Sequence, residues 1–321
     1  MEKTQRYLAL DVLRGITISG MILVNTPGSW SYVYAPLRHS QWHGCTPTDL
    51  VFPFFLFVMG VSMFFSFKKY GNSVNKHSLF KIIKRTALIF AIGLFLNSFP
   101  QWKMDVSTLR ILGVLQRIAL AYGISALLIL TLRMRVLQFT GAFILLSYWA
   151  VLYFFGNYSI EGNFTIAVDT AILGSNHMYH GFGIAFDPEG LLSTIPSIVT
   201  VLIGYITGWI IGQTERKSLP AKLLILSVIL VVSGWLWGLV FPINKPLWTS
   251  SYVLYTAGWA LLLLTVLIWL IDIKNFKKWT GFFVIFGMNP LFIYALSILW
   301  VKFLIYVVNF NRLCFRTLWE K

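Results

Sequence analysis

Nine apolar stretches, separated by shorter polar segments, set the pattern of hydrophobic and polar positions along this chain. Each approaches the ~20 apolar residues that an α-helix needs to cross the hydrocarbon core of a bilayer. The pattern predicts an all-α fold, a polytopic transmembrane helix bundle of about nine to ten spans, with the last stretch broken near Asn289 and Pro290. The nine stretches cover about residues 7–26, 49–67, 81–98, 109–131, 136–155, 190–213, 220–241, 249–272 and 279–309.

Basic residues alternate between the polar segments. Segments 1–6, 68–85, 132–135, 214–222 and 273–278 hold sixteen of the 26 Lys and Arg residues, whereas segment 156–189 holds none. Because basic loops stay on the cytoplasmic side, the pattern predicts a cytoplasmic N-terminus and outward-facing segments 27–48 and 156–189. The basic C-terminal tail does not fit an odd number of spans. Either the last stretch is a hairpin or the chain stops before a final span.

Composition supports a membrane location and excludes several classes of soluble protein. Of the 321 residues, 57% are hydrophobic and 12% are charged, against ~25% charged in soluble domains. The basic residues behind the net charge of +15 lie in short clusters between apolar stretches. This distribution is typical of loops that set the orientation of a membrane protein, and it does not suggest a nucleic-acid partner. The spacing of Cys45 and Cys314 suggests neither a disulfide framework nor a zinc site. No phosphate-binding loop, serine nucleophile elbow or metalloprotease motif is present.

Charged residues also occur inside the apolar stretches, where they are functional-site candidates, with structural pairing as the alternative. Asp11 and Arg14 are three positions apart in the first stretch, so one helix face brings them together and lets them neutralise each other. Arg117 follows Gln116 in the fourth stretch and has no acid nearby in sequence. The sequence therefore predicts that Arg117 binds a carboxylate, a phosphate or a group of carbonyls.

A second group of candidates lies where the chain enters and leaves the outer side. Asp49 opens the second stretch, where an acid either caps the helix or takes part in chemistry. His39 and His43 precede it by ten and six residues, so a turn back onto the helix start brings either one near its carboxylate. With Asn25 as a hydrogen-bond donor, His39 and Asp49 supply the base, the orienting acid and the oxyanion donor that acyl transfer requires. The alternative for His39 is a solvated loop histidine.

Segment 156–189 carries the remaining candidates. His177 and His180 are three positions apart, and Asp187 and Glu189 follow, which suggests a metal site only if the stretch is helical. No further motif supports a metal, and we expect none. We favour an acidic rim that binds a sugar or amine acceptor through His177, Asp187 and Glu189, with Trp42 as a flat apolar face. An ordinary ordered loop is the alternative.

Seven ordered blocks of these residues resemble the heparan-alpha-glucosaminide N-acetyltransferase family and its bacterial relatives, which are transmembrane acyltransferases. The block from His39 to Gly60 is quite specific, whereas the Asp-x-x-Arg-Gly opening at Asp11 is shared by wider membrane acyltransferases. The resemblance extends over about residues 8–295. The blocks are residues 10–16, 24–25, 39–60, 111–117, 185–198, 241–252 and 287–290.

The resemblance implies an enzyme that moves acetyl from cytosolic acetyl-CoA to the amine of a glucosamine-type sugar at the outer side of the membrane. His39 falls on the family's active histidine, Asn25 on its active-site asparagine, and Asp49 on the acid that follows. We expect His39 to act as a general base or to carry the acetyl group briefly. Asp49 would fix its tautomer, and Asn25 would donate to the developing oxyanion.

The same resemblance extends to the cofactor and to the location. Arg117 falls on the arginine of the family's Val-Leu-Gln-Arg motif, and we expect Arg14, Gln116 and Arg117 to bind acetyl-CoA. The long N-terminal domain of the lysosomal member is absent, which points to a bacterial inner membrane. We expect residues 1–321 to form one transmembrane acyltransferase domain, short of a final C-terminal helix that the resemblance would imply. A homodimer is one option for its assembly.

Three other functions remain open at this stage. An O-acetyltransferase of a cell-envelope glycan keeps the enzyme class and changes the acceptor. A sugar or proton-coupled transporter would use the polar residues to line a path, although the sequence lacks the internal repeats expected of that class. A non-enzymatic membrane subunit would use them for helix packing alone.

Overall fold

Helices make up the regular structure of the described chain, and no strand occurs within it. The computed structural model describes residues 7–27, 32–68, 75–99 and 105–319, with side chains described as far as residue 307. Short helices η2 (Ala35–Leu37) and η4 (Ser175–His177) lie in connecting segments, and the π-helix η5 (Ile268–Ile273) continues α9. The α-helices are α1 (Leu8–Asn25), α2 (Pro47–Phe67), α3 (Lys76–Ser98), α4 (Val114–Thr131), α5 (Met134–Phe155), α6 (Phe164–Leu173), α7 (Leu191–Gln213), α8 (Leu219–Trp237), α9 (Ser250–Leu267), α10 (Thr280–Met288) and α11 (Pro290–Trp319).

Eight helices of the described chain are long and apolar enough to cross a membrane: α1, α2, α4, α5, α7, α8, α9 with η5, and residues Pro290–Val307 of α11. The predicted all-α, multi-pass bundle is therefore confirmed. The helix break predicted near Asn289 is present, because α10 ends at Met288 and α11 begins at Pro290. The short helix α6 was not predicted.

The third predicted stretch, residues 81–98, lies in α3, which is not among the eight apolar spans. This helix has 23 residues, but its first three turns carry Lys76, Lys81, Lys84 and Arg85. Charge at one end therefore makes α3 less apolar than its neighbours.

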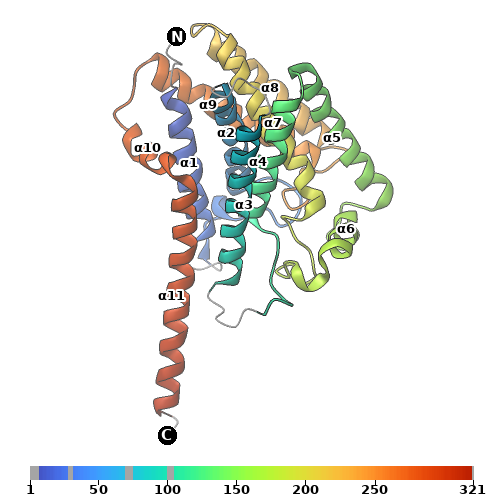
Figure 1. The fold of residues 1–321 in the computed structure, drawn as a ribbon, viewed down its shortest axis with the longest axis vertical. Helices are drawn as coiled ribbons and strands as arrows, with labels where there is room; N and C mark the ends of the chain where they lie inside the picture. Colours follow the sequence, from blue (N-terminus) through green and yellow to red (C-terminus); the bar gives the residue numbers. More distant parts are fainter. Residues whose placement is uncertain (1–6, 28–31, 69–74, 100–104, 320–321) are drawn as a thin grey trace.

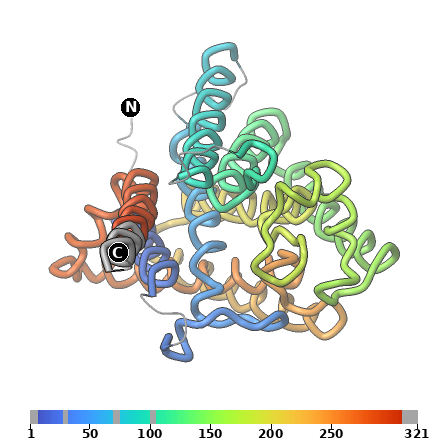
Figure 2. The backbone as a smooth tube through the Cα atoms, turned by 90° about the horizontal axis from the view of Figure 1, so that it is seen from below, coloured from blue at the N-terminus to red at the C-terminus, as the bar shows by residue number. Residues whose placement is uncertain are grey.

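The helices form an inner group and a periphery. Helix α2 packs against α1, α7 and α9, while α8 packs on α9. Helix α11 runs beside α1 and extends beyond the other helices (Figure 1). Along the bundle axis, α10 and α11 lie with α1 on one side, and α5 and α6 lie on the opposite side (Figure 2). Helices α5, α8 and α11 are much less buried than α2, α4 and α7.

Glycines bring the backbones of α2 and α7 into direct contact. A Cβ added to Gly60 would lie 2.0 Å from the Val201 carbonyl oxygen, and one added to Gly204 would lie 2.0 Å from that of Phe57. Gly204, Gly208 and Gly212 follow one another at intervals of four and share one face of α7. Such small residues allow membrane helices to pack closely, where dispersion replaces the hydrophobic effect as the driving force.

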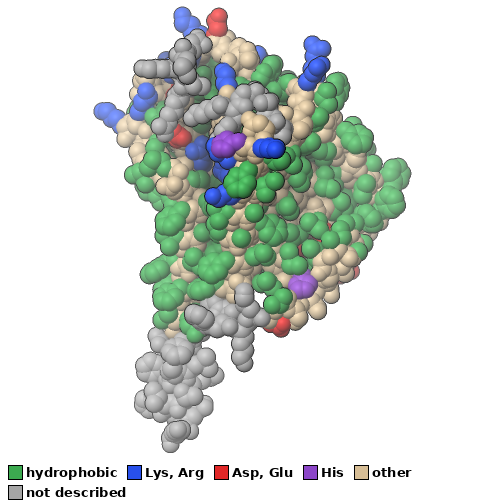
Figure 3. All heavy atoms as spheres, in the orientation of Figure 1, with side chains coloured by type: hydrophobic (Ala, Val, Ile, Leu, Met, Phe, Trp, Pro, Cys, Tyr) green, Lys and Arg blue, Asp and Glu red, His purple; other side chains and the backbone are tan. Residues whose placement is uncertain are grey.

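The two ends of the bundle differ in chemistry. The start of α1, the start of α3 and the α7–α8 connection lie at the same end of the bundle (Figure 1), which we name the basic end. Its basic residues include Lys76, Lys81, Lys84 and Arg85 of α3 and Lys217 of the α7–α8 connection. Lys and Arg gather at this end in the space-filling view, above a broad apolar surface (Figure 3). The opposite end, where α2, α4 and α7 begin, is named the histidine end. This arrangement agrees with the predicted alternation of basic segments, whose membrane orientation stays a prediction.

Candidate active site

Asp49 lies at the start of α2, where its carboxylate takes part in capping the helix. Thr46 is the N-cap, and its backbone N–H donates to Asp49 Oδ2 at 3.0 Å in a capping box. The Ser40 N–H donates to the same oxygen, also at 3.0 Å. Oδ2 therefore closes the helix end, and Oδ1 remains for a different partner. The residue is fully buried, so every carboxylate contact is made to protein.

His39 supplies that partner. Its Nδ1 lies 2.6 Å from Asp49 Oδ1, which confirms that the chain turns back onto the helix start. The turn is held by the Arg38 Nε, which donates to the Val33 carbonyl at 2.7 Å. We assign the hydrogen to Nδ1, because a carboxylate at this distance only accepts. Nε2 is then the unprotonated ring nitrogen, on a side chain that is 38% exposed.

Lys245, between α8 and α9, completes a three-residue cluster that the sequence analysis did not identify. Its Nζ lies 3.1 Å from His39 Nδ1 and 3.4 Å from Asp49 Oδ1. Burial lowers the pKa of Lys245, whereas the Asp49 and Glu189 carboxylates raise it. The available signal was its place in the block 241–252 that resembles the family.

The other two residues near this turn lie apart from the cluster. Asn25 is exposed at the end of α1 and, within the described chain, makes no hydrogen bond to His39 or Asp49. Its role as an oxyanion donor stays a prediction. His43 Nδ1 lies 3.4 Å from Asn244 Nδ2 instead of contacting Asp49, and burial lowers the pKa of His43.

An aromatic layer flanks the cluster at the histidine end. The Trp42 ring packs edge-on against Phe182 and Phe186, with ring centroids 6.1 and 5.5 Å away. The Trp42 indole N–H donates to the Tyr158 carbonyl at 2.7 Å, which fixes the ring. Trp42 is therefore a partly exposed aromatic surface in a fixed position, and its acceptor-binding role stays a prediction.

The predicted acidic rim is largely engaged with Arg110. The Arg110 guanidinium donates to both Asp187 oxygens, at 2.9 and 2.7 Å, and to Glu189 at 2.6 Å. The Asp187 side chain is fully buried, whereas that of Glu189 is 13% exposed. His177 Nδ1 lies 2.8 Å from the Leu109 carbonyl. These contacts anchor the loop, and the acceptor-binding roles of the three residues stay predictions.

No group of three or more His, Cys, Asp or Glu side chains is arranged to hold a metal within the described chain. His177 and His180, the pair considered in the sequence analysis, belong to no such group among the described residues.

Arg117 and Gln116 are buried in the first turn of α4, at the histidine end. The Arg117 guanidinium donates to the Ser193 and Thr194 hydroxyls at the start of α7, and lies 4.9 Å from the centre of the Trp248 ring. Gln116 packs against Gly93 of α3. Hydroxyls and an aromatic face surround Arg117, in addition to the carbonyl that the sequence suggested. Cofactor binding by either residue stays a prediction.

Asp169 of α6 is a buried acid that the proposed roles do not use. Its Oδ1 accepts hydrogen bonds from the N–H groups of Leu191 and Leu192 at the start of α7, while its buried Oδ2 has no hydrogen-bond partner among the described residues. Burial raises the pKa of Asp169 to about 6, and the Asp187 carboxylate acts in the same direction.

We predict a pH-dependent stability from Asp169. Because the folded-state pKa is above the unfolded value of 3.8, the folded protein binds a proton that the unfolded chain releases. Stability therefore rises as the pH falls from above 6 towards 4, by ~1.4 kcal/mol per unit of pKa shift. Melting temperatures of wild type and Asp169→Asn between pH 7.5 and pH 4.5 test this. The variant should show a weaker dependence on pH, and equal dependences would contradict the prediction.

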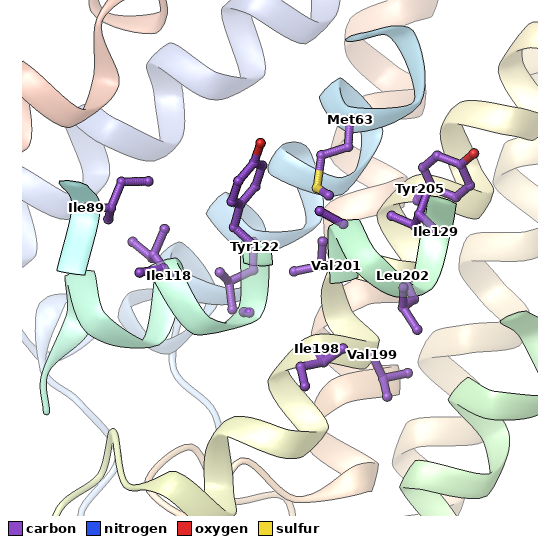
Figure 4. Packing of buried hydrophobic residues seen from close by; sticks show 14 of the residues in the cluster. Met63, Ile89, Ile118, Tyr122, Ile129, Ile198, Val199, Val201, Leu202 and Tyr205 are labelled. Carbon is purple, nitrogen blue, oxygen red and sulfur yellow. The ribbon is translucent and has the colours of Figure 1, made fainter. Parts of the chain in front are cut away.

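Two adjoining cavities connect the basic end with the interior. One has a volume of about 430 Å³ and the other about 290 Å³, and both are lined by Ser66, Phe67, Arg85 and Tyr122. The larger reaches Leu115 in the first turn of α4. Its walls belong partly to the apolar cluster of α2, α3, α4 and α7 (Figure 4).

Cationic side chains line the two cavities. Arg14 lines the larger cavity and Lys81 the smaller one, while Arg85 lies 4.7 Å from the centre of the Tyr122 ring. Arg14 contacts Asp11 at 3.3 Å, which confirms the predicted pair, and also donates to the Ser62 hydroxyl at 2.8 Å. The two cavities together therefore suit a ligand with an anionic head group and a long, less polar arm.

Comparison with known proteins identifies the family. The chain matches the family model described as "Heparan-alpha-glucosaminide N-acetyltransferase, catalytic" over residues 6–234. It is 30% identical to the heparan-alpha-glucosaminide N-acetyltransferase of Mus musculus, with 90% of this chain and 53% of the relative aligned. The same enzyme of Homo sapiens is 29% identical, with 90% and 52% aligned. The chain spans about half the length of these curated relatives. Because the family model covers most of the chain, this protein belongs to the heparan-alpha-glucosaminide N-acetyltransferase family.

Proposed function

We propose that this protein is a membrane N-acetyltransferase that moves acetyl from acetyl-CoA to the amine of a glucosamine-type sugar. The observation that carries the proposal is the 2.6 Å contact between His39 Nδ1 and Asp49 Oδ1. An imidazole oriented by a buried carboxylate is a general-base arrangement suited to acyl transfer. Family membership supports an acetyl group and a glucosamine-type amine as the reacting partners.

The proposed chemistry uses His39 Nε2, the ring nitrogen that does not contact Asp49. His39 Nε2 takes a proton as the acceptor amine attacks the thioester carbonyl. The new C–N bond forms, the C–S bond breaks, and the CoA thiolate leaves and receives the proton from the imidazolium. Asp49 stabilises that imidazolium through Nδ1, and Asn25 is proposed as a donor to the oxyanion. In a covalent variant of the route, Nε2 itself carries the acetyl group before the amine takes it.

The two adjoining cavities are the proposed binding site for acetyl-CoA. Lys81, Arg85 and Arg14 would meet its phosphates near the basic end, while the apolar lining would hold the pantetheine arm. Leu115 and Met21, which line the larger cavity, lie in the end turns of α4 and α1 that face the histidine end. With the basic end in the cytoplasm of a bacterium, the donor would enter there and the acceptor would bind outside.

Arg85→Ala should raise the KM for acetyl-CoA by roughly tenfold or more with little change in kcat, because a charge-assisted phosphate contact is worth ~1.5–3 kcal/mol. Steady-state kinetics in proteoliposomes measures this. Arg135→Ala is the matched control, since Arg135 is exposed and lines neither cavity. Equal KM values for the two variants would argue against the cavities as the donor site.

Labelled acetyl-CoA and glucosamine, supplied to wild-type protein in proteoliposomes, test the function as a whole. We expect acetylated product that survives mild base, because an amide is stable where an ester is cleaved. A base-labile product would indicate an O-acetyltransferase of a glycan. Sugar exchange across the membrane without acetyl-CoA would indicate a transporter, and both outcomes would contradict the proposal.

A further inference from the structure

We propose that Lys245 is a positioning residue that keeps His39 neutral, and so able to accept a proton, despite the carboxylate beside it. This inference rests on the proposed function for its catalytic meaning. Its structural content is a charge balance among three side chains, and that balance is measurable without any turnover.

Lys245 and Asp49 carry opposite charges and both lie close to His39 Nδ1, so they act in opposite directions on the protonation of the ring. Asp49 Oδ1 lies 2.6 Å from His39 Nδ1, and Lys245 Nζ lies 3.1 Å from the same atom. A carboxylate alone at this distance would favour the imidazolium, which is useless as a base. The ammonium 3.4 Å from the carboxylate compensates its charge, so the neutral imidazole faces a neutral pair.

The chain holds Lys245 firmly in this place. Its neighbour Asn244 is fully buried, and its side-chain amide donates to the Trp42 carbonyl at 2.9 Å. The Leu247 N–H donates to Asn244 Oδ1 at 2.8 Å, and the Gly44 N–H donates to the Ile243 carbonyl at 2.7 Å. The α8–α9 connection is therefore bonded to the same loop that carries His39. Because both groups share one rigid support, the distance between them is set by the fold.

The surrounding groups do not replace this charge. Burial raises the pKa of the Cys45 thiol to about 12, so the thiol stays neutral. Burial lowers the pKa of His43, which favours its neutral ring. Glu189 adds a negative charge whose effect reaches Lys245, and Arg38 directs its Nε to the Val33 carbonyl. Although burial lowers the pKa of Lys245, its side chain keeps a fifth of its surface accessible and lies beside a carboxylate, which favours the ammonium form.

The test titrates His39 directly. Diethyl pyrocarbonate reacts with the neutral imidazole of a histidine and not with the imidazolium, and mass spectrometry of peptides locates each modified histidine. Modification rates of His39 are measured against pH in wild type, Lys245→Met and Lys245→Arg, all in detergent as full-length chains. We expect Lys245→Met to move the midpoint upwards by about one pH unit or more, and Lys245→Arg to stay near wild type. Lys217→Met, at an exposed lysine of the basic end, should change nothing.

Two further readouts separate positioning from damage. His180 is exposed in another loop, so its modification rate serves as an internal control in each sample. An unchanged rate for His180 shows that the reagent is equally active and that this loop keeps its structure. Lys245→Gln provides a second neutral variant if Lys245→Met does not purify as a single species. In the transferase assay, the acid limb of kcat/KM should move with the midpoint while the KM for acetyl-CoA stays constant.

An unchanged His39 midpoint in the neutral variants would overturn the inference, whatever their activity. A wild-type protein that transfers no acetyl group would instead overturn the proposed function. In that case a midpoint shift in Lys245→Met would still support the charge balance.

Discussion

Replacing His39 with Ala is expected to lower acetyl transfer by about 10³-fold or more while leaving acetyl-CoA binding intact. The substitution removes the imidazole whose Nδ1 lies 2.6 Å from Asp49 Oδ1 and whose Nε2 would react in either the general-base or the covalent route. The two cavities proposed to bind acetyl-CoA are not lined by His39. Initial rates with labelled acetyl-CoA and glucosamine, together with an equilibrium binding measurement for CoA, check both parts of the prediction.

The matched control is His180→Ala, because His180 is an exposed loop histidine at the same end of the bundle. Its rate should remain near wild type. Full transferase activity in His39→Ala would eliminate both chemical routes at once. Loss of CoA binding together with activity would instead show that the substitution disturbs the fold.

Replacing Gly204 with Ala is expected to destabilise the bundle severely, although it adds a single methyl group. The added Cβ would lie 2.0 Å from the Phe57 carbonyl oxygen and 2.9 Å from the carbonyl carbon. These are backbone atoms of α2, so relief requires the two helices to separate along their contact. Overpacking of this kind costs ~1–3 kcal/mol or more, and we expect the melting temperature in detergent to fall by roughly 5 °C or more.

Gly212→Ala, on the same face of the same helix, is the control for this substitution. Its Cβ would meet the outer carbons of the Phe64 ring at 2.9 and 3.0 Å, which are side-chain atoms and not backbone atoms of α2. Thermal unfolding followed by size-exclusion chromatography should place Gly212→Ala near wild type and Gly204→Ala well below it. Equal melting temperatures for the two variants would contradict the close backbone contact of α2 and α7.

The core of the candidate site was accessible to sequence reasoning because it is local. His39 and Asp49 are ten residues apart, and Asp49 stands in the first turn of a helix that Thr46 caps. A short chain that returns to a helix start has few ways to place its side chains. Helix capping and a contact to His39 occur together because a carboxylate has two oxygens, and the catalytic role of that contact stays a prediction.

The partners of Arg117 illustrate where the same reasoning fails. The need for polar partners is a property of a buried guanidinium and could be inferred from the residue alone. Which groups meet that need depends on how α4 lies against α7, which brings the Ser193 and Thr194 hydroxyls to it. Asp187, which the sequence predicts to bind the acceptor, is likewise buried against Arg110, a residue 77 positions away that the tertiary fold brings to it.

The sequence by itself determined the all-α membrane bundle, the break at Pro290 and the pairing of Asp11 with Arg14. These features depend on hydropathy over one helix length, on the geometry of proline and on spacing along one turn, all of which are local properties. Only the tertiary structure brought Lys245 to His39, 206 positions away, and opened the cavities beside Arg85. Such contacts depend on the packing of distant helices and the path of their connections, which local spacing along the chain does not specify.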